Sequence, residues 1–191
     1  GESRAAFAVL TEAWKGLSQT DQNAWIAAWQ SGDWLRQDPL TGVSRSYGSA
    51  KSVFISLNFN YLIASSQVAA PYVEFSTPPT KGTLTPIGIT SVTIDASAGT
   101  VAVVYTGTLA SESLVFNMTA PVSAGNNRLT SVKSRLKQIT ATQSATPLAL
   151  GTDYVARVGG ISGAAGLKVG YTVEIIKETN ARQGKPPATR A

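Results

Sequence analysis

The sequence contains no cysteine and no histidine among its 191 residues. The absence of cysteine excludes disulfide bonds, thiolate nucleophiles and cysteine-ligated zinc sites. The absence of histidine excludes catalytic arrangements that use an imidazole as the general base. Carboxylate chemistry would rely on 11 Asp and Glu residues, which are scattered along the sequence. We therefore expect no enzymatic activity, no catalytic residue, no metal site and no cofactor.

Charged residues and long apolar segments are also scarce. Charged residues make up 14% of the chain and hydrophobic residues 43%. The chain can therefore fill a core, although it carries fewer charges than most domains. A net charge of +5 is more typical of a generic soluble surface than of a dedicated nucleic-acid-binding protein. No apolar run approaches the ~18 residues of a transmembrane helix, so we expect no membrane insertion.

The distribution of tryptophan marks a change of composition along the chain. All four Trp residues lie within 1–66, whereas the later residues carry most of the glycine and an alternation of Val, Ile and Thr. We predict a helical assembly or docking region at 1–66, a β-sandwich at 67–180, and an extended or disordered basic tail at 181–191.

In the helical region at 1–66, the first apolar residues have the spacing of a helix. Residues 2–14 place Phe7, Leu10 and Trp14 on a helical stripe. Gly16 follows and is expected to end the helix.

Two further helices are expected in the same region. Residues 17–32 begin with Ser18 and Asp21 at capping-box spacing, and Gly32 is a natural end. Residues 50–65 fit both a strand alternation and a helical stripe. We predict a helix there, because the segment is long for a strand.

Aromatic residues dominate the candidate contact residues of the helical region. Side chains of this kind at helical spacing usually form a core, less often a subunit interface, and rarely a ligand platform. The candidates for packing or a subunit interface are Trp14, Trp25, Trp29, Trp34, Phe54 and Tyr61. A region this small buries little surface alone, so we expect it to dock on the second domain or on a neighbouring subunit.

The second region has the pattern of a β-sandwich, with short alternating segments separated by turn residues. The predicted strands cover 88–97, 100–107, 111–120, 129–142, 152–160 and 170–178. Within 100–107, we expect Val101, Val103 and Tyr105 to share one face.

The stretch "LALGTDYVARV" at 148–158 resembles the corner before the penultimate strand of fibronectin type III domains. The resemblance implies that Leu148 closes the bottom of the sandwich, that Gly151 allows the turn, and that the Tyr154 hydroxyl bonds to nearby backbone. Leu150 departs from the proline usual there. The expected fold class is mainly β: an immunoglobulin-like (fibronectin type III-like) sandwich preceded by a small Trp-rich helical region.

A wider resemblance rests on two motifs. The first, W-x-x-L-[ST]-x-x-[QR]-x-x-W in its general form, is matched by Trp14, Leu17, Ser18, Gln22 and Trp25. The second, a "G…F…LN.N" helix, is matched by Gly48, Phe54, Leu57, Asn58 and Asn60. Together with the sandwich, they resemble structural proteins of tailed bacteriophages and prophages of Bacteroidota.

The resemblance implies a non-enzymatic structural protein of a virus particle, such as a capsid, decoration, neck or tail component. Its partners would be other copies of itself and other particle proteins, in a homo-oligomer located in the virion. The alternative is an extracellular or cell-surface adhesion or glycan-binding module, in which Trp34, Tyr47 and Tyr72 would stack on sugars.

Basic residues gather most densely near the middle of the second region. The patch comprises Arg128, Lys133, Arg135 and Lys137, of which the last three alternate and should share one strand face. It is a candidate contact for packaged nucleic acid or a protein partner. The alternative is a solvated edge strand, on which lysine blocks unwanted pairing.

Overall fold

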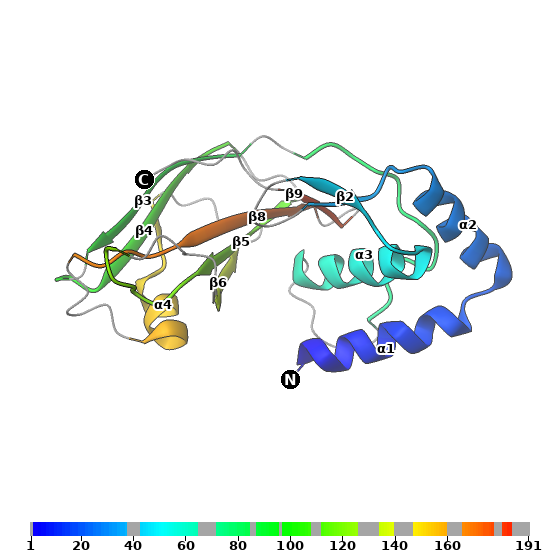
Figure 1. Cartoon of the computed structure of the whole chain (residues 1–191), viewed down its shortest axis with the longest axis horizontal. Helices are drawn as coiled ribbons and strands as arrows, with labels where there is room; N and C mark the ends of the chain where they lie inside the picture. Colours follow the sequence, from blue (N-terminus) through cyan, green and yellow to red (C-terminus); the bar gives the residue numbers. More distant parts are fainter. Residues whose placement is uncertain are drawn as a thin grey trace. The chain divides into compact units, whose positions relative to one another are not determined.

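The protein is described here by a computed structural model, which covers residues 2–37, 43–64, 72–84, 87–95, 97–107, 112–125, 134–139, 147–159, 166–177 and 181–184 (Figure 1). It contains helices and antiparallel strands in small sheets, so the fold class is mixed α/β rather than mainly β.

The chain divides into two compact units, which do not follow the boundaries expected from composition. The first comprises Gly1–Leu84 and Ile176–Gly184, and the second comprises Thr85–Ile175 and Lys185–Ala191. The structure thus places the division after Leu84 rather than near residue 66. It also returns 176–184, including the start of the expected tail, to the helical unit. Most of the second unit, Thr85–Ile175, therefore lies in sequence between the two segments of the first.

The first unit contains the three predicted helices and short strands. Its elements are α1 (Glu2–Gly16), α2 (Gln19–Gln30), β1 (Leu35–Gln37), β2 (Ser44–Ser46), α3 (Ala50–Ala64) and β9 (Arg182–Gly184). Residues 38–42 lie outside the described residues.

The predicted start of α2 is confirmed in atomic detail. The backbone N–H of Asp21 donates to Ser18 Oγ at 3.1 Å, and the Ser18 hydroxyl donates to Asp21 Oδ2 at 2.7 Å. This pair satisfies an N–H that a helix start leaves without a partner. Gly32, just after the helix, has a φ of 73°, which glycine adopts without strain.

Helix α3 is buried on nearly every side, which explains why its sequence fits two periodicities. Its buried side chains include Val53, Phe54, Leu57, Asn58 and Leu62. A helix surrounded by other elements is apolar all round, so its sequence also contains the alternation of a strand. Helices α1 and α2 both pack against it.

The described part of the second unit carries six strands, apart from the last two residues of β8, Ile176 and Lys177, which belong to the first unit. The strands are β3 (Gly88–Asp95), β4 (Thr100–Thr106), β5 (Glu112–Met118), β6 (Ser134–Ile139), β7 (Leu148–Ala149) and β8 (Tyr171–Lys177). One sheet has the order β3-β4-β7 and the other β6-β5-β8-β9. Five of the six predicted strand segments are therefore confirmed.

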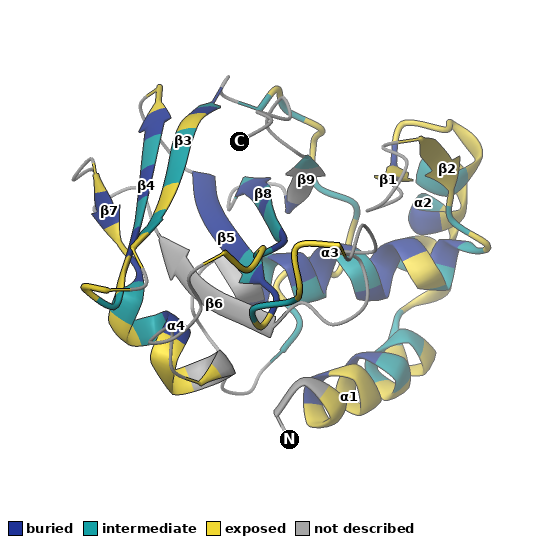
Figure 2. Ribbon diagram, turned by 60° about the vertical axis from the view of Figure 1, so that its left-hand side comes forward, coloured by how far each residue is buried: buried dark blue, intermediate teal, exposed yellow. Residues whose placement is uncertain are grey.

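Two strands show how burial shapes the sequence of this unit. In β4, Val101, Val103 and Tyr105 are buried and alternate with more exposed residues, as predicted. In β5, residues from Glu112 through Phe116 are all buried (Figure 2). An interior strand between β6 and β8 that is covered on both faces loses the polar alternation.

The strand predicted at 152–160 is wrong, because these residues form helix α4 (Gly151–Val158). Tyr154 is fully buried, whereas Val155 is 46% exposed and Ala156 is also exposed. This is the one-sided burial of a helix, and not the burial of every second residue that a strand would show.

The tyrosine corner expected from the fibronectin resemblance is also replaced by a different contact. The Tyr154 hydroxyl donates to Thr119 O at 2.8 Å, a carbonyl distant in sequence. Burial raises the pKa of Tyr154, so the phenol keeps the proton it donates. Leu148 is buried in β7 opposite Val103.

Gly151 is required by a close backbone approach. A Cβ at this position would lie 2.9 Å from Gly99 O, too short for any carbon–oxygen contact. The neighbouring Leu150 N–H donates to Val101 O at 2.7 Å, which holds the start of α4 against β4.

We predict that Gly151→Ala destabilises the protein by about 1–3 kcal/mol, because the added methyl group overpacks this contact. Urea unfolding measures the effect. Gly125→Ala is the matched control, since a Cβ there meets nothing within 4 Å. Equal midpoints for the two variants would contradict the prediction.

Candidate functional site

The described residues offer no grouped set of chemical ligands. Among them, no three Asp, Glu, His or Cys side chains come together as a metal site would need. In the same part of the chain, every buried side-chain nitrogen or oxygen has a hydrogen-bond partner. Nor does any helix described here combine the length and apolarity needed to cross a bilayer. The candidate functional residues are therefore those that pack and those that lie on the surface.

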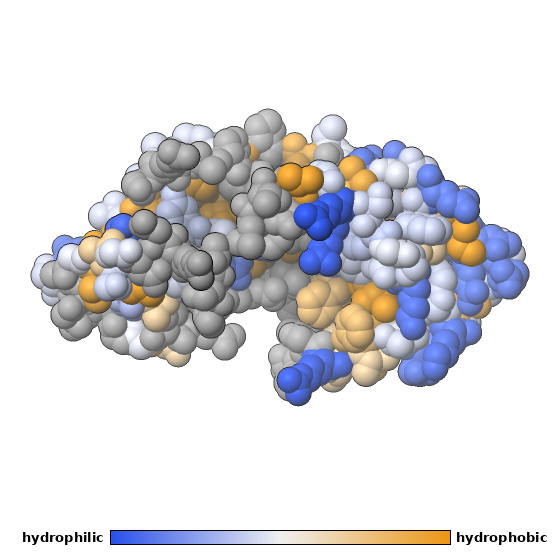
Figure 3. All heavy atoms as spheres, in the orientation of Figure 1, coloured by the Kyte–Doolittle hydropathy of each residue, from blue (hydrophilic) through white to orange (hydrophobic). Residues whose placement is uncertain are grey.

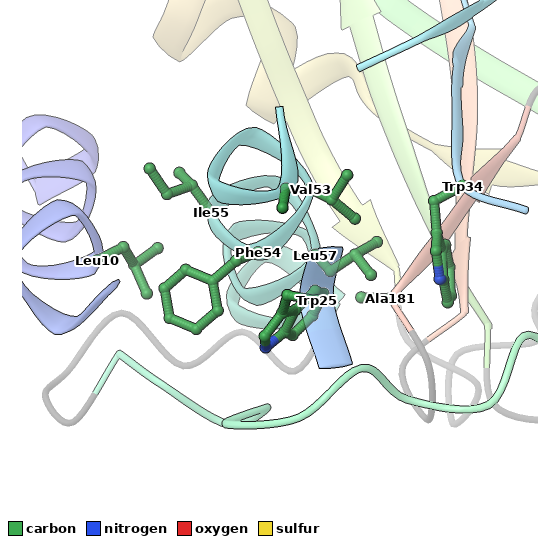
Figure 4. Close-up of a cluster of buried hydrophobic side chains, with 9 residues drawn as sticks. Leu10, Trp25, Trp34, Val53, Phe54, Ile55, Leu57 and Ala181 are labelled. Carbon is green, nitrogen blue, oxygen red and sulfur yellow. The ribbon is translucent and has the colours of Figure 1, made fainter. Parts of the chain in front are cut away.

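The aromatic candidates gather in one cluster of the first unit, called here the helical core (Figure 4). Its buried members are Leu10, Trp25, Trp34, Ala50, Val53, Phe54, Ile55, Leu57 and Ala181. Figure 4 shows Leu10 of α1 and Trp25 of α2 on either side of the Phe54 ring of α3.

Phe54 is the aromatic centre of this core. Its ring lies 5.5 Å from that of Trp14 and 5.4 Å from that of Trp25, with the latter pair edge to face at 87°. Edge-to-face pairs add about 0.5–1.5 kcal/mol beyond the area they bury. One residue of α3 thus joins the other two helices.

The indole N–H groups hold connecting segments in place. Trp25 Nε1 donates to Ser76 O at 2.7 Å, and Trp29 Nε1 donates to Tyr47 O at 2.7 Å. Buried tryptophan needs such a partner for its one polar atom.

The six aromatic candidates therefore divide into two groups. Trp25 and Phe54 are fully buried and Trp34 is 7% exposed, so these three belong to the interior of their own unit. Trp14, Trp29 and Tyr61 are half-buried at its margin. The Tyr61 ring packs edge to face on Phe75 at 5.4 Å.

The tryptophan-flanked motif at 14–25 joins α1 to α2. The Gln22 amide donates to Trp14 O at 3.1 Å and to Leu17 O at 3.4 Å, which ties α2 to the end of α1. Ser18 caps α2, and Trp25 anchors it in the core. Each residue of the motif thus has a structural role.

The buried side chain of Asn58 makes four hydrogen bonds to backbone groups. Its Nδ2 donates to Phe75 O at 3.1 Å and to Phe54 O at 3.0 Å. Its Oδ1 accepts from the N–H groups of Glu74 and Phe75, both at 2.8 Å. A carboxamide has two donor hydrogens and two acceptor lone pairs, and all four are used. The amide pairs with the backbone of Phe75 as a neighbouring strand would.

Asn60, two residues later, holds the returning C-terminal segment. Its Nδ2 donates to the carbonyl of Ala181 at 3.2 Å, and Ala181 is fully buried in the helical core. Ala181 has a φ of 54°, a left-handed conformation that is rare for residues other than glycine. Lys177 Nζ also donates to Thr83 O at 3.1 Å.

From the sequence, Asn58 and Asn60 were recognised only as matches to a motif, with no structural role assigned. The sequence feature that could have indicated such a role is the pair of polar residues in the apolar stretch "VFISLNFNYLI". Amides in such surroundings must be hydrogen-bonded, because burying an unpaired amide costs several kcal/mol. The partners Phe75 and Ala181 could not be predicted, because both lie beyond the expected boundary near residue 66.

The basic patch is only partly described. Arg128 and Lys133 lie outside the described residues, while Arg135 and Lys137 lie in β6, the outermost strand in the order of its sheet. Arg135 pairs with Asn117 and Lys137 with Phe116, so a bulge separates the two positions. The regular alternation behind the prediction of a shared face is therefore interrupted.

The aromatic residues proposed to stack on sugars do not form an open platform. Trp34 is buried, and the Tyr47 hydroxyl is hydrogen-bonded to Ser56 Oγ at 2.9 Å. Tyr72 is half-buried against the helical core. These positions are used for packing.

Comparison with known proteins leaves the chain without an assigned family. No protein-family model, no curated protein and no solved structure matches it significantly.

We predict that Asn58→Ala lowers the free energy of unfolding by about 2–4 kcal/mol, because several backbone groups lose their partner at once. Asn60→Ala, which removes one described bond, should cost about 1 kcal/mol. Urea unfolding followed by tryptophan fluorescence compares them. A smaller loss for Asn58→Ala than for Asn60→Ala would contradict the role given to Asn58.

Proposed function

We propose that this chain is a non-enzymatic structural protein that builds or decorates a virus particle by packing against other copies of itself. Helix α1 carries the main support. Its residues Ala5 to Leu10 are all apolar and therefore cover every side of the helix. Within its own unit, the helix buries only Ala6 and Leu10 of this run.

The remaining apolar side chains of the run are open to solvent. Phe7 is 57% exposed and Val9 is 43% exposed, and Ala5 and Ala8 are exposed as well. Figure 3 shows apolar atoms at the surface over α1. Phe7 was expected on the inward stripe with Leu10 and Trp14, and it lies outside it. Exposed apolar side chains grouped on one helix are typical of a surface that is covered in an assembly.

The charges on α1 favour a second copy as the partner. Arg4 and Glu12 are both exposed and lie four residues before and after Ala8. In an antiparallel pair of α1 helices centred on Ala8, Arg4 would therefore face Glu12 of the partner subunit, twice by symmetry. The small Ala8 side chain at the centre would let the helices approach closely.

We predict that Phe7→Asp weakens self-association at least tenfold, because burying a phenylalanine side chain is worth about 1.5–3 kcal/mol. Light scattering coupled to size exclusion measures the mass over a concentration series. Ile26→Asp, which alters a 37%-exposed apolar residue on α2, is the control and should leave the mass unchanged. A wild-type chain that stays at 19.9 kDa at every concentration would refute the proposed self-packing.

A charge swap tests the antiparallel geometry separately. Arg4→Glu alone should weaken association, because it places like charges opposite each other, and adding Glu12→Arg should restore it. The swap breaks the exposed Lys15–Glu12 pair, but such pairs contribute at most about 1 kcal/mol. If the double variant associated no better than the single one, α1 would not pair in this way.

Sedimentation tests whether the chain belongs to a particle. Nuclease-treated native material is fractionated, and the heavy fraction is analysed by mass spectrometry. Fixed stoichiometry with other particle proteins would support the proposal, and its copy number would separate a shell protein from a neck or tail component. Recovery only outside particles would refute the virion assignment and favour the alternative, an extracellular adhesion module.

We also propose that the second unit is an immunoglobulin-like sandwich. Its support is the presence of two antiparallel sheets with short strands. Helix α4, at the position expected for the penultimate strand, is the feature that speaks against it. An experimental structure of the full chain tests the assignment.

A further inference from the structure

Strands β1 and β2 form an exposed two-stranded ribbon in the first unit. Their register pairs Leu35 with Ser46, Arg36 with Arg45, and Gln37 with Ser44. The side chains of β1 described here, and all those of β2, are exposed (Figure 2). Because residues directly opposite each other share one face of a ribbon, the two arginines lie side by side.

The base of the ribbon is fixed to the helical core on both strands. Trp34, directly before β1, is buried in that core. Tyr47, directly after β2, accepts from Trp29 Nε1 at 2.7 Å through its carbonyl and is hydrogen-bonded to Ser56 through its hydroxyl. The arginine pair is therefore presented on a rigid base.

Two arginines opposite each other repel, so the pair is unfavourable unless an anion lies between them. Within the described residues, neither Arg36 nor Arg45 has an acidic partner, and neither strand contains an acidic residue. A guanidinium binds phosphate through paired N–H groups and does not lose its charge at any physiological pH.

We propose that the Arg36–Arg45 pair is a phosphate-binding site through which the ribbon contacts duplex nucleic acid. A two-stranded ribbon has the width that the major groove of B-DNA, about 12 Å, admits. This site is separate from the basic patch around β6, and it does not depend on self-association through α1.

The test is fluorescence anisotropy with a labelled DNA duplex of random sequence, at salt concentrations from about 50 to 200 mM. The variant Arg36→Gln/Arg45→Gln should bind at least about tenfold more weakly at low salt. The slope of log K against log salt should also become shallower by about 0.9 for each arginine removed. Both side chains are exposed, and a circular dichroism melt checks that the variant folds.

Lys51→Gln/Lys81→Gln is the matched control, since it removes the same net charge from positions of the same unit outside the ribbon. It should retain most of the affinity. Three results would overturn the proposal: wild-type protein that does not bind the duplex, an equal loss in the control, or displacement of the duplex by polyglutamate at equal charge. The last result would assign the ribbon to an acidic protein surface.

Discussion

The helical unit depends on one buried carboxamide, that of Asn58. It occupies both of its donors and both of its acceptors on backbone groups, three of them in the segment that follows α3. The segment 74–76 does not belong to any sheet, so these bonds replace the partner strand that its backbone would otherwise need. Trp25 completes the arrangement through Ser76, which links α2 to the same segment.

The side chains in the interior of this unit hold its own elements together. The indoles of Trp25 and Trp29 and the amide of Asn58 are hydrogen-bonded to backbone groups. Phe54 joins the rings of Trp14 and Trp25. The exposed features of this unit include apolar side chains of α1 and the arginine pair of the β1–β2 ribbon.

Local patterns predicted helices α1, α2 and α3, five of the six strand segments and the cap at Ser18, because these depend on neighbours in sequence. The interpretation of 152–160 failed because Tyr154, Ala156 and Val158 alternate, while the contact that fixes Tyr154 is a carbonyl 35 residues away. The partners of Asn58 and the facing of Arg36 and Arg45 depend on tertiary contacts and strand register, neither of which a single sequence displays.

The most direct test of the role of Asn58 is amide hydrogen exchange at Glu74 and Phe75 in the unmodified protein. If these N–H groups are held as described, they should exchange only through global unfolding and match the slowest amides of α3, despite lying outside any helix or strand. Exchange as fast as that of an exposed loop would mean that the segment opens independently, and that Asn58 does not organise the unit.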